Sequence, residues 1–153
     1  MEMNIAVIPG DGIGPEITTA AVTVLEAIAE KYGHVLNLQY VKACSQSVEE
    51  SGEPLPKEAL ETCLQADAVL LGNTGLEKYK NLPLSKRPEY ALLKLRKELK
   101  VTTNIRPVHV YPELKLLSPL NQNALSKGLD YLFVRDIAGG VLCSDQVKGE
   151  GEN

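Results

Sequence analysis

The chain begins with short apolar runs that alternate with longer amphipathic segments. Asn4–Ile8 is an apolar run bounded by Pro9-Gly10, and Asp67–Leu71 is one that ends at Gly72, which is typical of buried strands. Val35–Val41 alternates between apolar and polar residues and predicts a further strand. Residues 15–32 keep apolar positions at helical spacing and Lys57–Gln65 forms a shorter segment, so both are predicted to be helices. This order predicts an α/β fold with a partly parallel sheet and flanking helices.

The later part of the chain has a different pattern. A long polar loop reaches Pro88, and an amphipathic helix is predicted over Glu89–Leu99. Val101–Ile105 is predicted to be extended and to end at Arg106-Pro107. A last strand is predicted over Leu129–Arg135, before a turn that begins at 139.

Composition narrows the class of protein. The chain has 153 residues, of which 44% are hydrophobic and 24% charged, which excludes a disordered chain and a disulfide scaffold. The net charge of −4 argues against a general nucleic-acid binder. Cys44, Cys63 and Cys143 are odd in number and form no CxxC pair, so we expect reduced thiols. The first apolar run, Ile5–Pro9, is too short for a signal peptide or a membrane span, and we expect a cytoplasmic protein.

A glycine-rich turn joins the first predicted strand to the first predicted helix. Gly10, Gly12 and Gly14 permit a close backbone approach, and the start of a helix favours a negative group. The dinucleotide-binding pattern GxGxxG fails, because Pro15 stands where its last glycine belongs, and no acidic residue ends the second strand. The glycines alone leave two interpretations open, a ligand cradle and a tight turn without a ligand.

Three arginines are candidates for recognising a carboxylate. Arg96 lies on the amphipathic helix, and Arg106 and Arg135 are predicted to stand at strand ends. Guanidinium groups suit planar, bidentate recognition of carboxylates, and ligands of open α/β sheets bind at the carboxyl ends of strands. Taken singly, each arginine is more often a surface ion-pair partner, and spacing cannot establish that the three converge.

Several of these segments together resemble one enzyme family. They are the segments 8–16 (IPGDGIGPE), 67–72 (DAVLLG), 87–97 (RPEYALLKLRK), 104–107 (NIRP) and 134–140 (VRDIAGG). In this order they are similar to motifs of the β-decarboxylating dehydrogenases, the isopropylmalate and isocitrate dehydrogenase superfamily. The resemblance covers essentially the whole chain and is strongest to the N-terminal part of the branch that acts on 3-isopropylmalate.

The resemblance implies a reaction, cofactors and site residues. A 2-hydroxy acid is oxidised and decarboxylated with NAD and Mg²⁺ or Mn²⁺, which for 3-isopropylmalate is a step of leucine biosynthesis. The matching arginines Arg96, Arg106 and Arg135 are expected to grip substrate carboxylates, and Glu89 and Leu92 to distinguish substrates. The apolar Leu92 suits an isopropyl group. The residues expected near the cofactor are Ile13, Gly72, Asn73, Thr74 and Gly75.

Two departures from the family pattern affect these expectations. Leu142 stands where the family has a catalytic tyrosine, and no neighbour is an obvious replacement. Family chains are more than twice as long, and their catalytic lysine and metal-binding aspartates lie beyond position 153. We therefore expect no metal ligand within this chain, and no activity from it alone.

The resemblance also implies a domain division and leaves alternatives open. It divides the chain into 1–100, part of a first α/β domain, and 101–153, the start of a second domain. A homodimer is expected for the full-length protein. The alternatives are a tartrate/malate- or homoisocitrate-specific relative and a catalytically dead copy that binds a carboxylate or regulates a partner. The choice between NAD and NADP and the exact substrate stay open.

Overall fold

The protein is described by a computed structural model covering residues 1–120, 123, 125 and 128–139. The chain divides into two compact units, Met1–Leu99 and a second unit that begins at Lys100.

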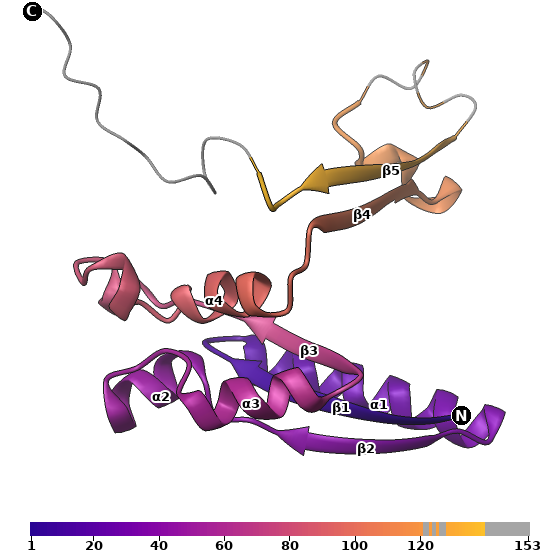
Figure 1. The fold of residues 1–153 in the computed structure, drawn as a ribbon. Coiled ribbons are helices and arrows are strands. Elements are labelled where there is room, and N and C mark those ends of the chain that lie inside the picture. Colours follow the sequence, from indigo (N-terminus) through magenta and orange to yellow (C-terminus); the bar gives the residue numbers. More distant parts are fainter. Residues whose placement is uncertain (121–122, 124, 126–127, 140–153) are drawn as a thin grey trace, which may run out of the picture. The chain divides into compact units, whose positions relative to one another are not determined.

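A three-stranded parallel sheet forms the centre of the first unit (Figure 1). Its strands are β1 (Glu2–Gly10), β2 (Val35–Tyr40) and β3 (Ala68–Asn73). They lie in the order β2-β1-β3, so β1 pairs on both sides, and Ile5 aligns with Leu38 of β2 and Ala68 of β3. The predicted parallel α/β arrangement is confirmed, with strand ends that differ from the prediction by one or two residues.

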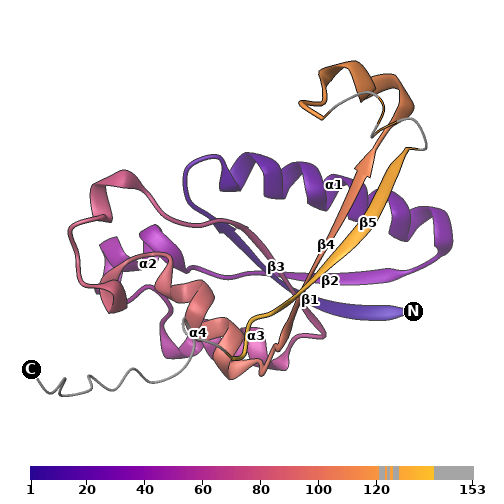
Figure 2. The same ribbon diagram turned by 90° about the horizontal axis from the view of Figure 1, so that it is seen from above.

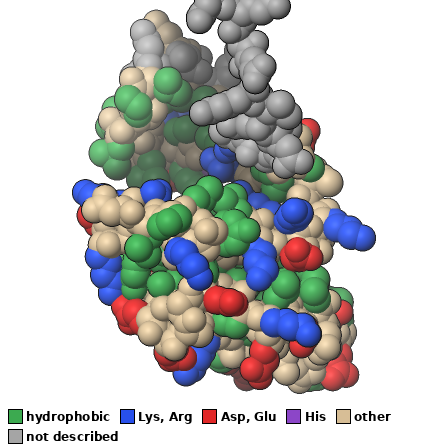
Figure 3. Space-filling model, turned by 60° about the vertical axis from the view of Figure 1, so that its left-hand side comes forward, with side chains coloured by type: hydrophobic (Ala, Val, Ile, Leu, Met, Phe, Trp, Pro, Cys, Tyr) green, Lys and Arg blue, Asp and Glu red, His purple; other side chains and the backbone are tan. Residues whose placement is uncertain are grey.

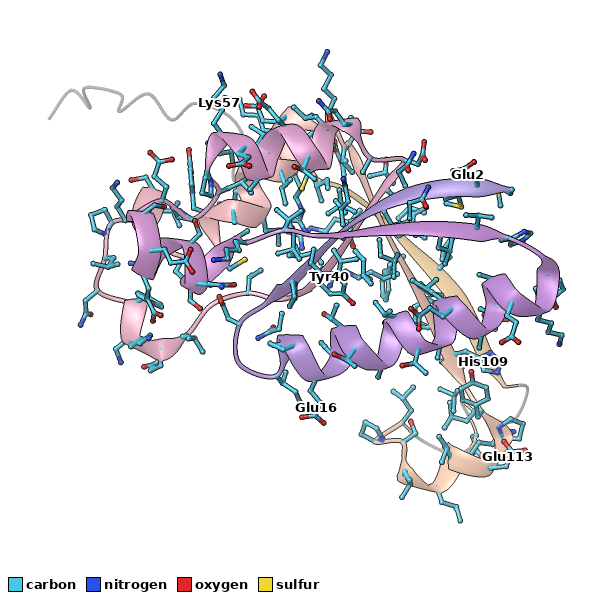
Figure 4. The ribbon with its side chains drawn as sticks, turned by 90° about the horizontal axis from the view of Figure 1, so that it is seen from below. Glu2, Glu16, Tyr40, Lys57, His109 and Glu113 are labelled. Carbon is cyan, nitrogen blue, oxygen red and sulfur yellow. The ribbon has the colours of Figure 1, made fainter. Side chains whose placement is uncertain are left out.

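Helices cover both faces of this sheet. Figures 2 and 4 show α1 (Gly14–Tyr32) on one side and α3 (Lys57–Gln65) on the other, and α2 (Cys44–Ser51) and α4 (Tyr90–Glu98) complete the unit. In Figure 4, Glu16 of α1 and Lys57 of α3 point away from the sheet in opposite directions.

The side chains of β1 alternate between two cores. Ile5 and Val7 pack with Val22 of α1 in one core. Ala6 and Ile8 contribute to the other, which also includes buried residues of α3 and α4. Because β1 is buried on both faces, its sequence is a continuous apolar run, as expected for the central strand of a parallel sheet.

The buried face of α1 is narrower than its apolar pattern suggests. Thr18, Val22 and Ala29 are buried, whereas Val24 is 58% exposed and Ile28 is 45% exposed. The helix ends at Gly33, which adopts a left-handed conformation (φ 65°) and whose N–H donates to a carbonyl of the last turn.

The second unit contains a two-stranded antiparallel sheet of β4 (Thr103–Val110) and β5 (Leu129–Asp136). The prediction that the first of these strands ends at Arg106-Pro107 is wrong, because β4 continues to Val110. Pro107 fits inside the strand since each strand of a two-stranded sheet has one unpaired edge, where a missing N–H costs nothing. A 3₁₀ helix, η3 (Pro112–Leu117), follows β4.

Three short elements of the first unit were not predicted from the sequence. They are α2 and the 3₁₀ helices η1 (Glu77–Tyr79) and η2 (Leu84–Lys86). Cys44 opens α2 in a left-handed conformation (φ 60°), which is unusual for a side-chain-bearing residue. Cys44 and Cys63 are buried free thiols, while Cys143 lies outside the described residues.

The described part of the chain is characterised further by its helices and its surface charge. Within the described residues, none of the helices combines the length and apolar character that crossing a membrane requires. On the face drawn in Figure 3, the described Lys and Arg side chains are interspersed with Asp and Glu, without a broad expanse of one sign.

Candidate functional site

The loops that follow β1 and β3 lie in backbone contact at the carboxyl edge of the parallel sheet. The N–H of Asp11 donates to the carbonyl of Asn73 at 2.7 Å. A Cβ on Gly10 would lie 2.0 Å from that carbonyl oxygen, and one on Gly72 would lie 2.1 Å from the carbonyl oxygen of Pro9. The glycines therefore serve a close approach of two loops, which is the reason for at least part of the glycine-rich turn.

Asp11 is the buried polar centre of this edge. Its side chain is 2% exposed, and Oδ2 accepts a hydrogen bond from the N–H of Gly75 at 2.7 Å. Oδ1 accepts one from the N–H of Ser45 at 2.8 Å and a second from the Ser45 hydroxyl. Sequence analysis did not select Asp11 or Ser45, because no spacing rule relates residues so far apart in the chain.

The thiol of Cys44 lies near two carboxyl groups. Burial, followed by the charges of Asp11 and Glu89, raises the pKa of Cys44 to about 12. A thiol with this pKa stays protonated at neutral pH, so Cys44 is a packed core residue and not a nucleophile.

Glu89 lies directly before α4 and contacts Gly75. A Cβ on Gly75 would be 2.5 Å from Oε1 of Glu89, so only a glycine lets the carboxyl group lie against the backbone there. The second carboxyl oxygen, Oε2, is buried and has no hydrogen-bond partner among the described residues. An acceptor without a partner at this position is available to a donor from a ligand.

The predicted substrate residues of the first unit share one side of α4. Glu89, Leu92 and Arg96 are spaced three and four residues apart, which aligns their side chains along one helical face. All three are partly exposed. Among the described residues, Arg96 forms no ion pair with a carboxylate. This face therefore combines an acceptor, an apolar side chain and an unpaired guanidinium.

The structure brings the two arginines of the second unit together. Asn104 pairs with Arg135 across the antiparallel strands, and Arg106 is two residues from Asn104, so the three side chains share one face of the sheet. Nε of Arg106 donates to Oδ1 of Asn104 at 2.7 Å. Both arginines are exposed, and neither forms an ion pair within the part of the chain that is described.

The expected reason for this proximity was wrong. Arg106 lies in the middle of β4 and not at a strand end, and its sheet is antiparallel. The rule that places ligands at the carboxyl ends of parallel strands therefore does not apply to Arg106 and Arg135. They come together because period-two alternation and strand register place them on one face.

The predicted cofactor residues lie around the same edge as Asp11. Ile13 is 57% exposed just before α1, and Gly72 and Asn73 end β3. Thr74 and Gly75 continue the loop, and Gly75 has a φ of 101°. Within the described residues, no three His, Cys, Asp or Glu side chains are grouped to hold a metal ion. Leu142 lies outside the described residues.

A second polar cluster links α2 to the 3₁₀ helix η1. Oε1 of Glu49 accepts hydrogen bonds from Nζ of Lys78 and, at 2.8 Å, from the hydroxyl of Tyr79. The Lys78 ammonium also lies 4.9 Å from the centre of the Tyr79 ring. The hydrogen bond from Lys78, followed by that from Tyr79, lowers the pKa of Glu49.

Comparison with known proteins places these features in a family. The sequence model described as isocitrate/isopropylmalate dehydrogenase matches residues 4–152. The 3-isopropylmalate dehydrogenases of Helicobacter hepaticus and Clostridium pasteurianum are both 47% identical to this chain, over 92% and 95% of its length. The matched segments make up 40% and 41% of these relatives, so the chain spans about two fifths of their length.

A solved structure agrees with this result. The apo form of a β-decarboxylating dehydrogenase from Thermococcus kodakarensis superposes with a TM-score of 0.64 at 32% identity, covering 88% of this chain and 33% of that protein. The match over residues 4–152, the parallel sheet and the structural likeness lead to one conclusion: the chain belongs to the isocitrate/isopropylmalate dehydrogenase family.

Proposed function

We propose that this chain supplies substrate-recognising residues of an enzyme that oxidises and decarboxylates a 2-hydroxy acid, with 3-isopropylmalate as the substrate. The observation that carries the proposal is the pair Arg106 and Arg135 on one face of the β4–β5 sheet, exposed and without carboxylate partners among the described residues. Two guanidinium groups on one face of a sheet suit a carboxylate better than any neutral ligand. The names of the relatives support the choice of substrate.

The face of α4 supports the specificity part of the proposal. Arg96 contributes a cation to this helical face, and Leu92 contributes an apolar side chain one turn before it. An isopropyl group gains from contact with Leu92, whereas the additional carboxylate of isocitrate would require a hydrogen-bond donor there. Glu89 contributes the acceptor Oε2 to the same face.

The cofactor part of the proposal rests on the edge of the parallel sheet. When bound, NAD accepts the hydride that leaves the hydroxyl carbon of the substrate, and Mg²⁺ or Mn²⁺ polarises the resulting carbonyl. The partly exposed loop at Gly75 and the exposed Ile13 support this position for the cofactor. The described residues present no set of ligands for the metal.

The proposal extends to the organisation of the protein. Residues 1–100 are assigned to part of a first α/β domain and 101–153 to the start of a second domain. The active enzyme is proposed to be a cytoplasmic homodimer. The family resemblance is the support for both the domain assignment and the homodimer.

A chimera tests the proposal. In it, this chain replaces the matching segment of the Clostridium pasteurianum 3-isopropylmalate dehydrogenase, which is 47% identical over 145 residues. We expect NAD reduction that depends on 3-isopropylmalate, and a loss of about a hundredfold in kcat/KM for Arg106→Ala or Arg135→Ala. Arg87→Ala is the matched control, because the Nε of Arg87 donates to the Leu82 carbonyl, outside the proposed site.

The same chimera separates the alternatives. Tartrate, malate, isocitrate and homoisocitrate are assayed beside 3-isopropylmalate, and faster turnover of any of them would overturn the choice of substrate. Leu142 favours the alternative of a catalytically dead copy, because a leucine cannot transfer a proton. If the chimera turns over substrate only after Leu142→Tyr, this chain is such a copy.

A further inference from the structure

Asp11 has no role in the proposed function, yet it connects three segments of the first unit. Its carboxyl group is 2% exposed. Oδ2 accepts from the N–H of Gly75, and Oδ1 accepts from the N–H and hydroxyl of Ser45. A single buried side chain after β1 therefore holds the loop after β3 and the first turn of α2. Within the described part of the chain, neither backbone N–H donates a hydrogen bond to another acceptor.

The loop held by Asp11 is the surface on which Glu89 lies. The Oε1, Cδ and Cγ atoms of Glu89 would lie 2.5, 2.8 and 3.0 Å from a Cβ on Gly75. The Glu89 side chain thus packs against the backbone of Gly75. A shift of Gly75 would therefore change the position of the carboxyl group. Asp11 and Glu89 also both lie near the thiol of Cys44, where their charges add to the effect of burial in raising its pKa.

We propose that Asp11 is a positioning residue for Glu89. It holds the N–H of Gly75 so that the backbone of this glycine supports the Glu89 carboxyl group, whose Oε2 is buried and has no hydrogen-bond partner among the described residues. The proposal rests on the proposed function, because that function gives Glu89 its role at the site. Asp11 itself touches no reacting group, and its effect passes through Gly75.

The first test uses the 153-residue chain and needs no substrate. In Asp11→Ala, we expect amide hydrogen exchange at Gly75 and Ser45 to become about tenfold faster, because each N–H loses its acceptor. The side-chain carboxyl signal of Glu89 should shift in the NMR spectrum of the same variant. Unchanged exchange at Gly75, or an unmoved Glu89 signal, would overturn the proposal.

A matched control lies at the opposite edge of the same sheet. Oδ2 of Asp67 accepts a hydrogen bond from the N–H of Asn4 at 2.8 Å, so Asp67→Ala removes a comparable contact. This variant should leave Gly75 and Glu89 unaffected. If Asp67→Ala also speeds exchange at Gly75 and shifts the Glu89 signal, the loss of either aspartate loosens the sheet. The proposal would then fail.

A milder variant serves if Asp11→Ala does not fold. The amide of Asp11→Asn has only one acceptor oxygen, so one of the two N–H groups loses its partner whichever way the amide is oriented. We expect faster exchange at Gly75 or at Ser45, with a shift of Glu89 only if Gly75 is the residue released. Unchanged exchange at both residues would contradict the proposal.

The second test uses the chimera and distinguishes positioning from general support. Asp11→Asn should lower kcat/KM about tenfold alone, but add little loss in a chimera that already carries Glu89→Gln. Independent losses that multiply would show that Asp11 acts by another route. An inactive parent chimera would count against the proposed function, and the exchange measurements would still decide whether Asp11 holds Gly75 and Glu89.

Discussion

Gly72 illustrates how single residues determine the geometry of the site. A Cβ at this position would lie 2.1 Å from the carbonyl oxygen of Pro9 and 2.6 Å from Oγ1 of Thr18. The nearest obstacle is backbone, which cannot rotate away as a side chain can. Glycine is therefore required at position 72 for the loops after β1 and β3 to approach each other, independently of any ligand.

Gly72→Ala is expected to destabilise the chain by about 3 kcal/mol, the upper range for overpacking a buried site. Gly33→Ala provides the comparison, because Gly33 has a positive φ but open space around it. It should cost about 1 kcal/mol through backbone strain alone. Urea unfolding of both variants measures the difference, and equal losses would show that the loops separate easily.

The Cys44 thiol is expected to make the free energy of unfolding depend on pH in the alkaline range. Its pKa is raised from 9.0 to about 12, first by burial and then by Asp11 and Glu89. The folded state holds the proton more tightly, so this contribution is complete below pH 9 and is lost as the pH rises towards 12. The urea midpoint should fall across this range less steeply in Cys44→Ala than in the parent chain. Identical slopes in both proteins would contradict the assignment.

Among the helices and strands, those with a clear hydrophobic pattern were predicted well from the sequence. β1, β3, α1 and α3 have apolar runs or helical periods bounded by glycine or proline, and they form where the sequence indicates. The prediction missed α2, whose segment 44–51 is mostly polar and begins with a cysteine in a left-handed conformation. No residue type at that position signals such a conformation, as a glycine would have done.

The candidate site was predictable in its residues but not in its geometry. Sequence motifs selected the arginines, but reading Pro107 as a strand end misplaced Arg106, because proline is tolerated at an unpaired strand edge. Asp11 and Ser45 were missed because a hydrogen bond between residues 34 positions apart leaves no local pattern. Contacts of this kind depend on the assembled sheet.

The link between α2 and η1 is expected to weaken in acid. The pKa of Glu49 is lowered from its ordinary value of 4.5 by its hydrogen bonds with Lys78 and Tyr79. The stability that these bonds contribute is therefore present above pH 4.5 and is lost as the pH falls through the lowered pKa. Exchange of the Tyr79 amide should become a few-fold faster below that pH. Glu49→Gln should remove most of this pH dependence, whereas Glu50→Gln, which affects the neighbouring pair with Lys42, should preserve it. Equal behaviour of the two variants would argue against the link.

At the scale of the whole molecule, two units carry different parts of the proposed recognition. The first unit presents Glu89, Leu92 and Arg96 on one helical face, and the second presents Arg106 and Arg135 on one sheet face. The chain belongs to the isocitrate/isopropylmalate dehydrogenase family and spans about two fifths of its similar relatives. The proposed activity therefore needs to be tested with the remaining part of a family member present.

The most direct measurement is the initial rate of NAD reduction by the chimera, with 3-isopropylmalate and Mn²⁺, before any substitution is made. We predict turnover that requires the substrate and that falls when Arg106 or Arg135 is replaced by alanine. A chimera that is folded and dimeric but reduces no NAD with 3-isopropylmalate would contradict the proposed function.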